Sequence, residues 1–389
     1  MKIHEDTIKP TAPVTKNLIQ RIKNLPKASK ILMLAGIVLI VAAGIFLILR
    51  GLGFGQWNSL IDDTPNESTS PAQTTQSAII MEDPKTEISP LTGILVTKNA
   101  YNAITANSVI GVAVDNHLDA RPQYNLNKAD LVYEFLAEGG ITRILAVYLS
   151  ENVSQIGPVR SAREYILNWI LEYNALFSHI GGSAEALAHI RTYGVRDMDQ
   201  FTLGSAAYWR GTDKVAPHNV YASTQKLWEY AAGQNKNSFA PFRVWKFKED
   251  ISEAERGTVS SVSFAFGFGG SSLYSVGWTY DAVTNRYLRS NGGYEHKDAA
   301  SGEVLSAHNV IVQFTNQYPS GDAQNHVIIE NIGSGSALFF LDGTVVEGTW
   351  QKDARESRTI YLTKDGTEMQ FNRGRSWIEV LPIATPVTY

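Results

Sequence analysis

The sequence predicts an α+β protein with an N-terminal transmembrane helix, an α/β ectodomain and then a predominantly antiparallel β domain. Three observations predict this order. An uncharged apolar run lies near the N-terminus, and units of strand, glycine turn and capped helix occupy the middle of the chain. Short runs rich in aromatic and β-branched residues, separated by turn residues, fill the remainder. The 389 residues allow about two or three folded units.

The apolar run at residues 31–49 has no charged side chain. At about 1.5 Å per residue it matches the roughly 30 Å hydrocarbon core of a bilayer. Basic residues dominate before the run and acidic residues after it, so the positive-inside rule predicts a cytoplasmic tail at 1–30. A cleaved signal peptide is the alternative, but the run is long for one and no A-x-A cleavage site follows. We therefore expect a single-pass cell-membrane protein with its C-terminal ectodomain outside the cytoplasm.

The segment after the apolar run, residues 50–90, is rich in Ser, Thr, Pro, Gln and Asn. This composition buries too little apolar surface to offset chain entropy, which predicts a flexible linker. The ectodomain then divides by pattern into an α/β domain at 91–235 and a β-rich domain at 236–389.

Composition excludes several function classes. The chain has no cysteine, so disulfides, thiolate metal sites and a cysteine nucleophile are excluded. The formal net charge of −4 provides no overall attraction to nucleic acid, and we expect no nucleic-acid partner. No metal-binding loop or zinc-binding helix motif occurs, so metal and cofactor stay unknown at this stage.

The α/β domain begins with a buried strand that ends at Asp115. Two extended runs between residues 131 and 148 then predict a hairpin. The Ser161-to-Glu164 spacing fits a capping box at the start of a helix, and Ser183 and Ser223 are placed to cap two later helices.

The β-rich domain contains short runs of aromatic and branched residues between turns. Asp342-Gly343 is a strong signal for a two-residue hairpin turn, because both positions favour positive φ. The chain shows no convincing internal repeat.

Arginines gather around the expected start of the first helix. Arg160 and Arg163 flank that start, where free backbone N–H groups and the helix dipole favour an anion. Guanidinium groups can donate paired hydrogen bonds to phosphate or carboxylate. The alternative is that either arginine forms a structural ion pair with Glu164, Glu134 or Glu138. For two arginines beside a glycine turn, the sequence favours an anion site.

Candidate catalytic residues are Asp115, at a strand end, and His218, in a polar turn, either of which could act as a general base. The expected site is a single Arg-rich cleft that brings distant segments together. The ligand-binding residues expected in it are Asn116, His117, Arg121, Arg143, Arg160, Arg163, Gly181, Gly182 and Asn219.

Several segments resemble a known family. VDNHLDARPQYNLNKADLVYEFLAEGGITRILAVY, IGPVRSAREY, HIGGSAEAL and APHNVYAS are similar to the N-terminal domain of the YerB-like lipoproteins of bacteria, and the region from GTVVEGTW to WIEVLP is similar to their C-terminal β domain. The resemblance covers nearly all of residues 105–385 and implies an extracytoplasmic, membrane-tethered protein. That family has no settled activity. Its members carry a lipid-attachment cysteine, which this chain lacks.

A second similarity, between Asp130 and Val195, is to the LytR-CpsA-Psr phosphotransferases, which act on lipid-linked wall polymers. The chain departs from their motifs, because Ser161 stands where they have an Asp after the Arg. Three functions follow as hypotheses: binding of an anionic cell-envelope ligand, a phosphotransferase-like reaction on lipid-linked wall precursors, and a non-catalytic role in envelope assembly.

Overall fold

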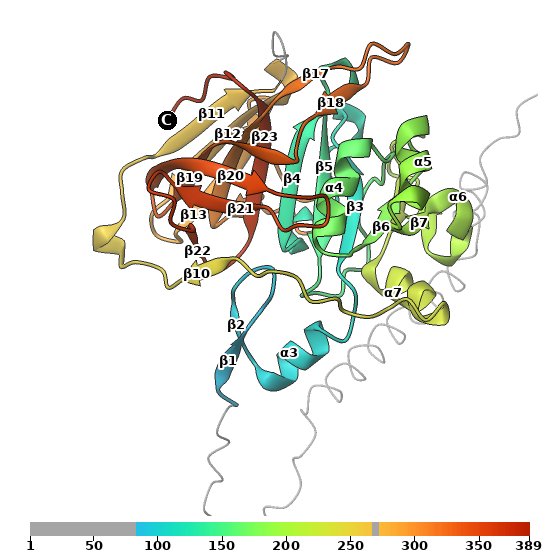
Figure 1. Ribbon diagram of the computed structural model, residues 1–389, viewed down its shortest axis with the longest axis horizontal. Helices are drawn as coiled ribbons and strands as arrows, with labels where there is room; N and C mark the ends of the chain where they lie inside the picture. Colours follow the sequence, from blue (N-terminus) through green and yellow to red (C-terminus); the bar gives the residue numbers. More distant parts are fainter. Residues whose placement is uncertain (1–82, 267–271) are drawn as a thin grey trace, which may run out of the picture. The chain divides into compact units, whose positions relative to one another are not determined.

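The central feature of the computed structural model is a ten-stranded mixed sheet (Figure 1). The structure describes residues 83–266 and 272–389, which lie in one compact unit. In order across the sheet, the strands are β21 (Ile360–Thr363), β20 (Thr344–Lys352), β19 (Gly333–Leu341), β16 (Asn309–Thr315), β23 (Ser376–Pro382), β4 (Leu131–Leu136), β5 (Thr142–Tyr148), β3 (Ile110–Asp115), β6 (Leu176–His179) and β7 (Arg196–Asp199).

The remaining strands form smaller sheets. A five-stranded antiparallel sheet holds β11 (Ser261–Ala265), β12 (Ser275–Asp281), β13 (Arg286–Asn291), β14 (Tyr294–Glu295) and β15 (Ser306–Ala307). Four two-stranded pairs are β1 (Lys85–Ile88) with β2 (Leu95–Thr97), β8 (Tyr208–Arg210) with β9 (Val220–Ala222), β10 (Lys246–Lys248) with β22 (Gln370–Asn372), and β17 (Gln317–Pro319) with β18 (Val327–Ile329).

The described helices are short. They are α3 (Lys98–Ile104), α4 (Glu164–Glu172), α5 (Ala184–Thr192), α6 (Gln200–Leu203) and α7 (Thr224–Gly233). Two begin as the sequence predicts, because the Ser183 hydroxyl accepts from the Ala186 N–H and the Ser223 hydroxyl accepts from the Lys226 N–H.

The predicted cap of α4 is wrong. Arg163, not Ser161, is the N-cap of this helix, and it makes no side-chain capping bond. Ala162 donates its N–H to the Gly181 carbonyl and forms a parallel β-bridge with Gly182. This pairing keeps residues 161–162 extended beside the turn that follows β6, so the helix starts later than the sequence pattern predicts.

The predicted fold class also needs correction. The described residues contain twenty-three strands against five α-helices, the longest of ten residues, so this part of the chain is mainly β. Strands of the α/β segment and of the β-rich segment join one sheet, because β23 pairs in parallel with both β16 and β4. Strand periodicity indicates which face of a strand is buried but not which strand pairs with it. The sequence therefore could not predict that the two segments share one sheet.

The predicted membrane helix at 31–49 lies outside the described residues, as do the tail at 1–30 and most of the predicted linker at 50–90. β1 falls within the last part of that predicted linker. In the described part of the chain, every helix is too short or too polar to cross a membrane.

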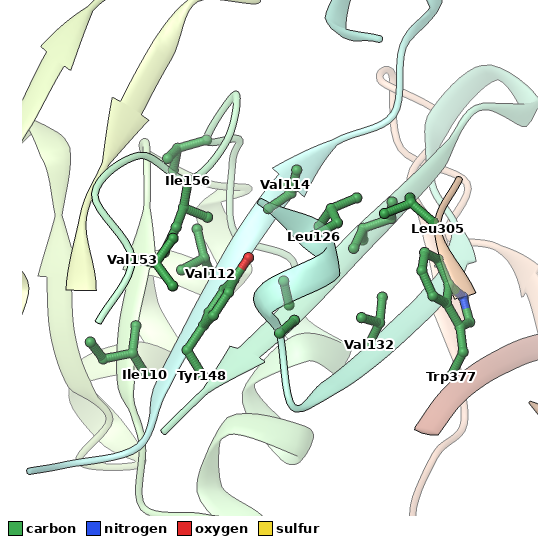
Figure 2. Packing of buried hydrophobic residues seen from close by; sticks show 14 of the residues in the cluster. Ile110, Val112, Val114, Leu126, Val132, Tyr148, Val153, Ile156, Leu305 and Trp377 are labelled. Carbon is green, nitrogen blue, oxygen red and sulfur yellow. The ribbon is translucent and has the colours of Figure 1, made fainter. Parts of the chain in front are cut away.

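Alternating side chains of the central sheet enter two separate cores. Val112, Val114 and Val132 point to one face, where Leu126 and Ile156 cover them (Figure 2). The intervening side chains point to the other face, where they meet α4. Gly111 permits this contact, since a Cβ there would lie 2.3 Å from the Ile170 Cδ1. The sheet is therefore held rigidly from both sides, and its strand ends are fixed in space.

Candidate functional site

The site begins where β3 ends. Asp115, the last residue of this fully buried strand, is 3% exposed. Its Oδ1 accepts the backbone N–H of His117 at 3.0 Å, which closes the turn after the strand. Strands β3, β4, β6 and β7 all run in the same direction, so their carboxyl ends lie at one edge of the sheet. Ligand sites of open sheets commonly form at this edge.

Two distant side chains meet the other carboxylate oxygen of Asp115. The His218 Nδ1 lies 2.7 Å from Asp115 Oδ2, and the Arg160 Nε lies 3.2 Å from the same atom. Since the carboxylate accepts from Nδ1, the His218 Nε2 is the ring nitrogen that has no hydrogen-bond partner among residues 83–266 and 272–389. The predicted catalytic pair is therefore brought into direct contact across 103 positions of sequence.

Backbone pairing explains this convergence. The segment between β5 and α4 follows the end of β3, because Arg160 donates its N–H to the Ala113 carbonyl at 2.8 Å. The same segment pairs with β9, since Val159 donates its N–H to the Val220 carbonyl at 2.7 Å. Arg160 and His218 are thereby both placed over Asp115.

The loop before β9 is held by Asn219. Its Oδ1 accepts from Arg210 at 2.7 Å, and its Nδ2 donates to the Gly211 carbonyl at 3.0 Å. Asn219 was predicted to bind ligand, and in the structure its side chain cross-links the β8–β9 hairpin next to His218. Its contacts are those of a residue that positions the imidazole.

The imidazole of His117 stacks on that of His218, with ring centroids 4.6 Å apart and planes inclined by 15°. His117 also caps the 3-10 helix Leu118–Ala120, because its Nδ1 accepts the Asp119 N–H at 3.2 Å. In the described part of the chain, the side chains grouped closely enough to share a metal ion are His117, Asp119 and His218.

An open hollow of about 880 Å³ adjoins His218. Its walls combine basic, acidic and apolar groups. They are formed by Asp119, Arg121, Pro122, Tyr124, Asp213, Lys214, Val215, Ala216, Pro217, His218 and Ala299.

Asn116 lies behind the hollow, where it accepts a hydrogen bond from Arg121, one of the residues that line it. Asn116 is fully buried, donates to Glu134 and Thr142, and accepts from Gln123 and the Arg121 Nε. The Arg121 guanidinium lies over the Tyr274 ring, and burial lowers the pKa of this guanidinium. Asn116 has its hydrogen-bonding groups satisfied inside the protein, which is the pattern of a structural residue.

The other predicted arginines form a second group around Glu138. The Arg143 and Arg163 guanidiniums both contact this carboxylate, and each also donates to a backbone carbonyl, of Ser161 and Ala162 respectively. Burial raises the pKa of Glu138, but hydrogen bonding and charge from the two arginines outweigh burial and leave that pKa below its usual value. The pair of Arg163 with Glu138 is the structural ion pair of the alternative interpretation, and Arg143 joins it.

Gly181 and Gly182 lie with the second group. Gly181 has a φ of +56° and donates its N–H to Asp199 at 2.8 Å. A smaller hollow of about 480 Å³ lies here, lined by Ser161, Arg163, Glu164, Tyr165, Gly182, Ser183, Ala184, Glu185, Ser320, Asp322, Gln324, His326, Val327 and Ile328. Of the residues expected in one cleft, Arg121 and His218 line the first hollow, whereas Arg163 and Gly182 line the second.

Comparison with known proteins agrees with this architecture. Two family models match, the DUF3048 N-terminal domain at residues 91–238 and the DUF3048 C-terminal domain at 266–378, both described as protein of unknown function. A protein of Bacillus subtilis (strain 168) named "Putative lipoprotein YerB" is 30% identical over 302 residues, covering 75% of this chain and 86% of that protein. The chain belongs to the DUF3048 family.

The fold of this DUF3048 protein is also similar to a solved structure. The crystal structure of the YerB protein from Bacillus subtilis matches with a TM-score of 0.69 and 27% sequence identity, covering 78% of this chain and 100% of that chain. The resemblance to YerB-like lipoproteins, seen first in short sequence motifs, is confirmed.

The localisation expected from sequence is corrected by these findings. The relative of this DUF3048 protein is named a lipoprotein, a class that membranes retain through attached lipid. The described residues contain no helix able to span a bilayer. The name of the relative contradicts the expected single-pass arrangement with a cytoplasmic N-terminus. An apolar run in the sequence does not by itself distinguish one mode of membrane association from another.

Sequence reasoning missed a buried charge network behind the DUF3048 site. Arg289 is fully buried and contacts the carboxylates of Glu134 and Glu379. Its guanidinium lies over two indole rings, at 5.1 Å from Trp278 and 4.4 Å from Trp377. The alternation of β13 places Arg289 on the inward face with Tyr287, a signal that could have identified it as buried.

This network reaches the site through two side chains. The His296 Nδ1 accepts from the Arg289 Nε at 3.1 Å, and its Nε2 contacts the Gln123 Oε1 at 2.7 Å. Gln123 in turn donates to the Asp115 carbonyl at 3.0 Å. Burial raises the pKa of Glu379 to about 8, because one guanidinium serves two carboxyl groups in an apolar surrounding.

Proposed function

We propose that this DUF3048 protein binds an anionic ligand of the cell envelope in the hollow beside Asp115 and His218. The observation that carries the proposal is the sharing of one carboxylate oxygen by Arg160 and His218. Arg160 reaches Asp115 through Nε, and within residues 83–266 and 272–389 its terminal amino groups have no hydrogen-bond acceptor. These donors are available to an oxyanion.

The walls of the hollow support the same class of ligand. Arg121 and Lys214 add positive charge there. The Asp213 carboxylate is already engaged, since it accepts from Lys214 at 3.0 Å and from the Tyr221 hydroxyl at 2.8 Å. Asp119 is the remaining acidic group of the walls, and its side chain is 72% exposed. The proposed site contains fewer arginines than the expected Arg-rich cleft, because Arg143 and Arg163 are paired with Glu138.

The ligand chemistry is a phosphate, pyrophosphate or carboxylate group, each of which matches guanidinium donors. The envelope part of the proposal is supported by the name of the B. subtilis relative, which describes a lipoprotein. Two sources carry this chemistry, a lipid-linked phosphate precursor and a soluble anionic wall polymer.

Calorimetric titration of the full-length protein with inorganic pyrophosphate tests the proposal directly. We expect binding that Arg160→Gln weakens at least about tenfold, since a charge-assisted hydrogen bond contributes about 1.5–3 kcal/mol. Arg243→Gln is the matched control, because Arg243 is an exposed arginine paired with Glu368. Equal affinity of the Arg160 variant and the wild type would refute the proposal. Vesicles containing a polyprenyl phosphate, compared with a soluble anionic wall polymer, then distinguish the two sources.

A second candidate function is catalysis on the same ligand. The 2.7 Å contact between His218 Nδ1 and Asp115 favours it, because a carboxylate-oriented imidazole with a free Nε2 has the geometry of a general base. Incubation with a polyprenyl-pyrophosphate substrate, with and without Mg²⁺, tests this function. Turnover that His218→Gln abolishes while ligand binding persists would support catalysis, and binding without any turnover would exclude it.

A further inference from the structure

We propose that His117, Asp119 and His218 bind one divalent transition-metal ion of the zinc class at the mouth of the hollow. Their ligand atoms lie within 4.8 Å of one another. Two imidazoles and one carboxylate suit such ions, and three protein ligands leave a coordination position open. This inference goes beyond anion binding and does not depend on it.

The contact with Asp115 orients His218 as a metal ligand. Its Nδ1 is held by the buried Asp115 carboxylate at 2.7 Å, so the proton lies on that side and the Nε2 lone pair is free. Metal-binding imidazoles almost always have such a partner on the second nitrogen, which fixes both the tautomer and the orientation of the ring. Asp115 is in turn oriented by the His117 N–H and by Arg160.

His117 and Asp119 provide the other ligands from one short turn. The His117 Nδ1 and the Asp119 Oδ2 are 3.5 Å apart. Bonds of 2.0–2.1 Å to a tetrahedral zinc ion separate two ligand atoms by about 3.3 Å, so this pair already has the spacing of one edge of the tetrahedron. The His117 Nδ1 now accepts the Asp119 N–H at 3.2 Å, and metal binding would replace that weak bond.

The three ligand atoms must move closer together to bind one ion. The two imidazoles are stacked nearly parallel, and ligation of one ion by both requires the His117 ring to tilt out of the stack. Both moving side chains are accessible, with 33% exposure for His117 and 72% for Asp119. The buried partner, Asp115, stays in place, so closure involves side-chain rotation of surface groups around a fixed His218.

The charges facing the group balance before an ion binds. Asp115 and Asp119 are negative, and Arg160 balances one of them. Arg121 and Lys214 stand on the wall of the hollow, where Lys214 is paired with Asp213. A dication at the three ligands would leave local positive charge toward the hollow, which an anionic oxygen could satisfy at the open coordination position.

The test uses the full-length protein, free of any affinity tag, treated with a chelator and then titrated with Zn²⁺ alone against a chromophoric competitor. We expect one tightly bound equivalent. Asp119→Asn and His218→Gln should each weaken binding at least about tenfold. His189→Gln is the matched control, because His189 is a half-buried histidine that pairs with Glu164 and lies outside the group. This control should bind as the wild type does.

A spectroscopic measurement distinguishes loss of the metal site from misfolding of a variant. Co²⁺ in place of Zn²⁺ should give the visible absorption of a tetrahedral site, and the exposed Asp119→Asn change should shift or remove it. Absence of a stoichiometric metal, or identical Zn²⁺ affinity in the wild type and in both ligand variants, would overturn the inference. Pyrophosphate titration in excess chelator separates the two proposals, because anion binding that persists there leaves the proposed function intact even if metal binding fails.

Discussion

Two carboxylates lie at the ends of β3 and β4, which run in the same direction on either side of β5, yet their surroundings differ. Asp115 is the last residue of β3, and Glu138 lies just past the end of β4. At Glu138, the Arg143 and Arg163 guanidiniums contact the carboxylate and also donate to backbone carbonyls. Most of the hydrogen-bonding capacity there is used within the protein. The group resembles a structural cross-link between β4, β5 and the start of α4.

At Asp115, the partners keep unused groups. Arg160 and His218 share one carboxylate oxygen, and in the described part of the chain the second nitrogen of the imidazole has no hydrogen-bond partner. The hollow next to His218 is open to solvent. The comparison teaches that the number of cationic side chains near a strand end is a poor guide to a site. The number of donors and lone pairs left after internal pairing is a better one.

The largest expected effect comes from Glu138→Gln. This change removes the counter-charge of Arg143, whose side chain is only 8% exposed, so we expect a loss of about 3 kcal/mol in the free energy of unfolding. Urea denaturation measures it. Glu347→Gln is the control, because Glu347 pairs with Lys364 on the surface and should cost less than about 1 kcal/mol. Equal losses in the two variants would show that the Glu138 group is no structural cross-link.

Asp115→Asn should act mainly on binding. An amide at this position no longer holds the His218 tautomer, so we expect Zn²⁺ affinity to fall about 10–100-fold, or about 1.4–2.7 kcal/mol. Competitive metal titration measures it. The comparison predicts that Glu138→Gln leaves Zn²⁺ affinity within about twofold of wild type in the folded protein. A large loss of Zn²⁺ affinity in both variants would show that the Asp115 group and the Glu138 group belong to one site.

Asn219→Ala should have a smaller effect. The loop before β9 then loses the two hydrogen bonds that Asn219 makes to Arg210 and Gly211, which contribute about 1 kcal/mol each. We expect a several-fold loss of Zn²⁺ or pyrophosphate affinity and a loss of about 1–2 kcal/mol in the free energy of unfolding, measured with urea. A loss as large as that of Asp115→Asn would mean that Asn219 contacts the ligand itself.

The smallest expected effect is on the pH dependence of the free energy of unfolding. The Glu138 pKa lies below its unfolded value, so its stabilisation is present above about pH 4.5 and is lost as the pH falls through the folded pKa. In Glu138→Gln the acid side of the stability profile should therefore be flatter than in the wild type. Urea denaturation at a series of pH values measures the slope, and Glu347→Gln should leave it unchanged.

Local structure could be predicted where one residue decides it. Ser183 and Ser223 cap helices as expected. The Asp342-Gly343 turn closes the β19–β20 hairpin with positive φ at both residues. The contact of Asp115 with His218 also matches the expected cleft. These features depend on short-range conformational preferences or on polar residues placed at strand ends.

The rest depends on pairing between distant strands. The burial of Arg289 requires Glu134 and Glu379 to come from two neighbouring strands of another sheet, which no local pattern reveals. The same reason explains why the arginines near α4 could not be sorted into bound and free from sequence. Each pairing was possible, and the turn between β4 and β5 together with the position of residues 161–163 selects Glu138.

The position of β23 has a consequence for how the protein reaches its native state. This strand occupies residues 376–382, near the end of the chain, yet it lies between β16 and β4 in the middle of the sheet. Until β23 is present, both neighbours keep an open edge with unpaired backbone groups. Pairing of the central sheet must therefore wait for residues 376–382, and a chain without β23 would expose the edges of β16 and β4, which are paired in the folded protein.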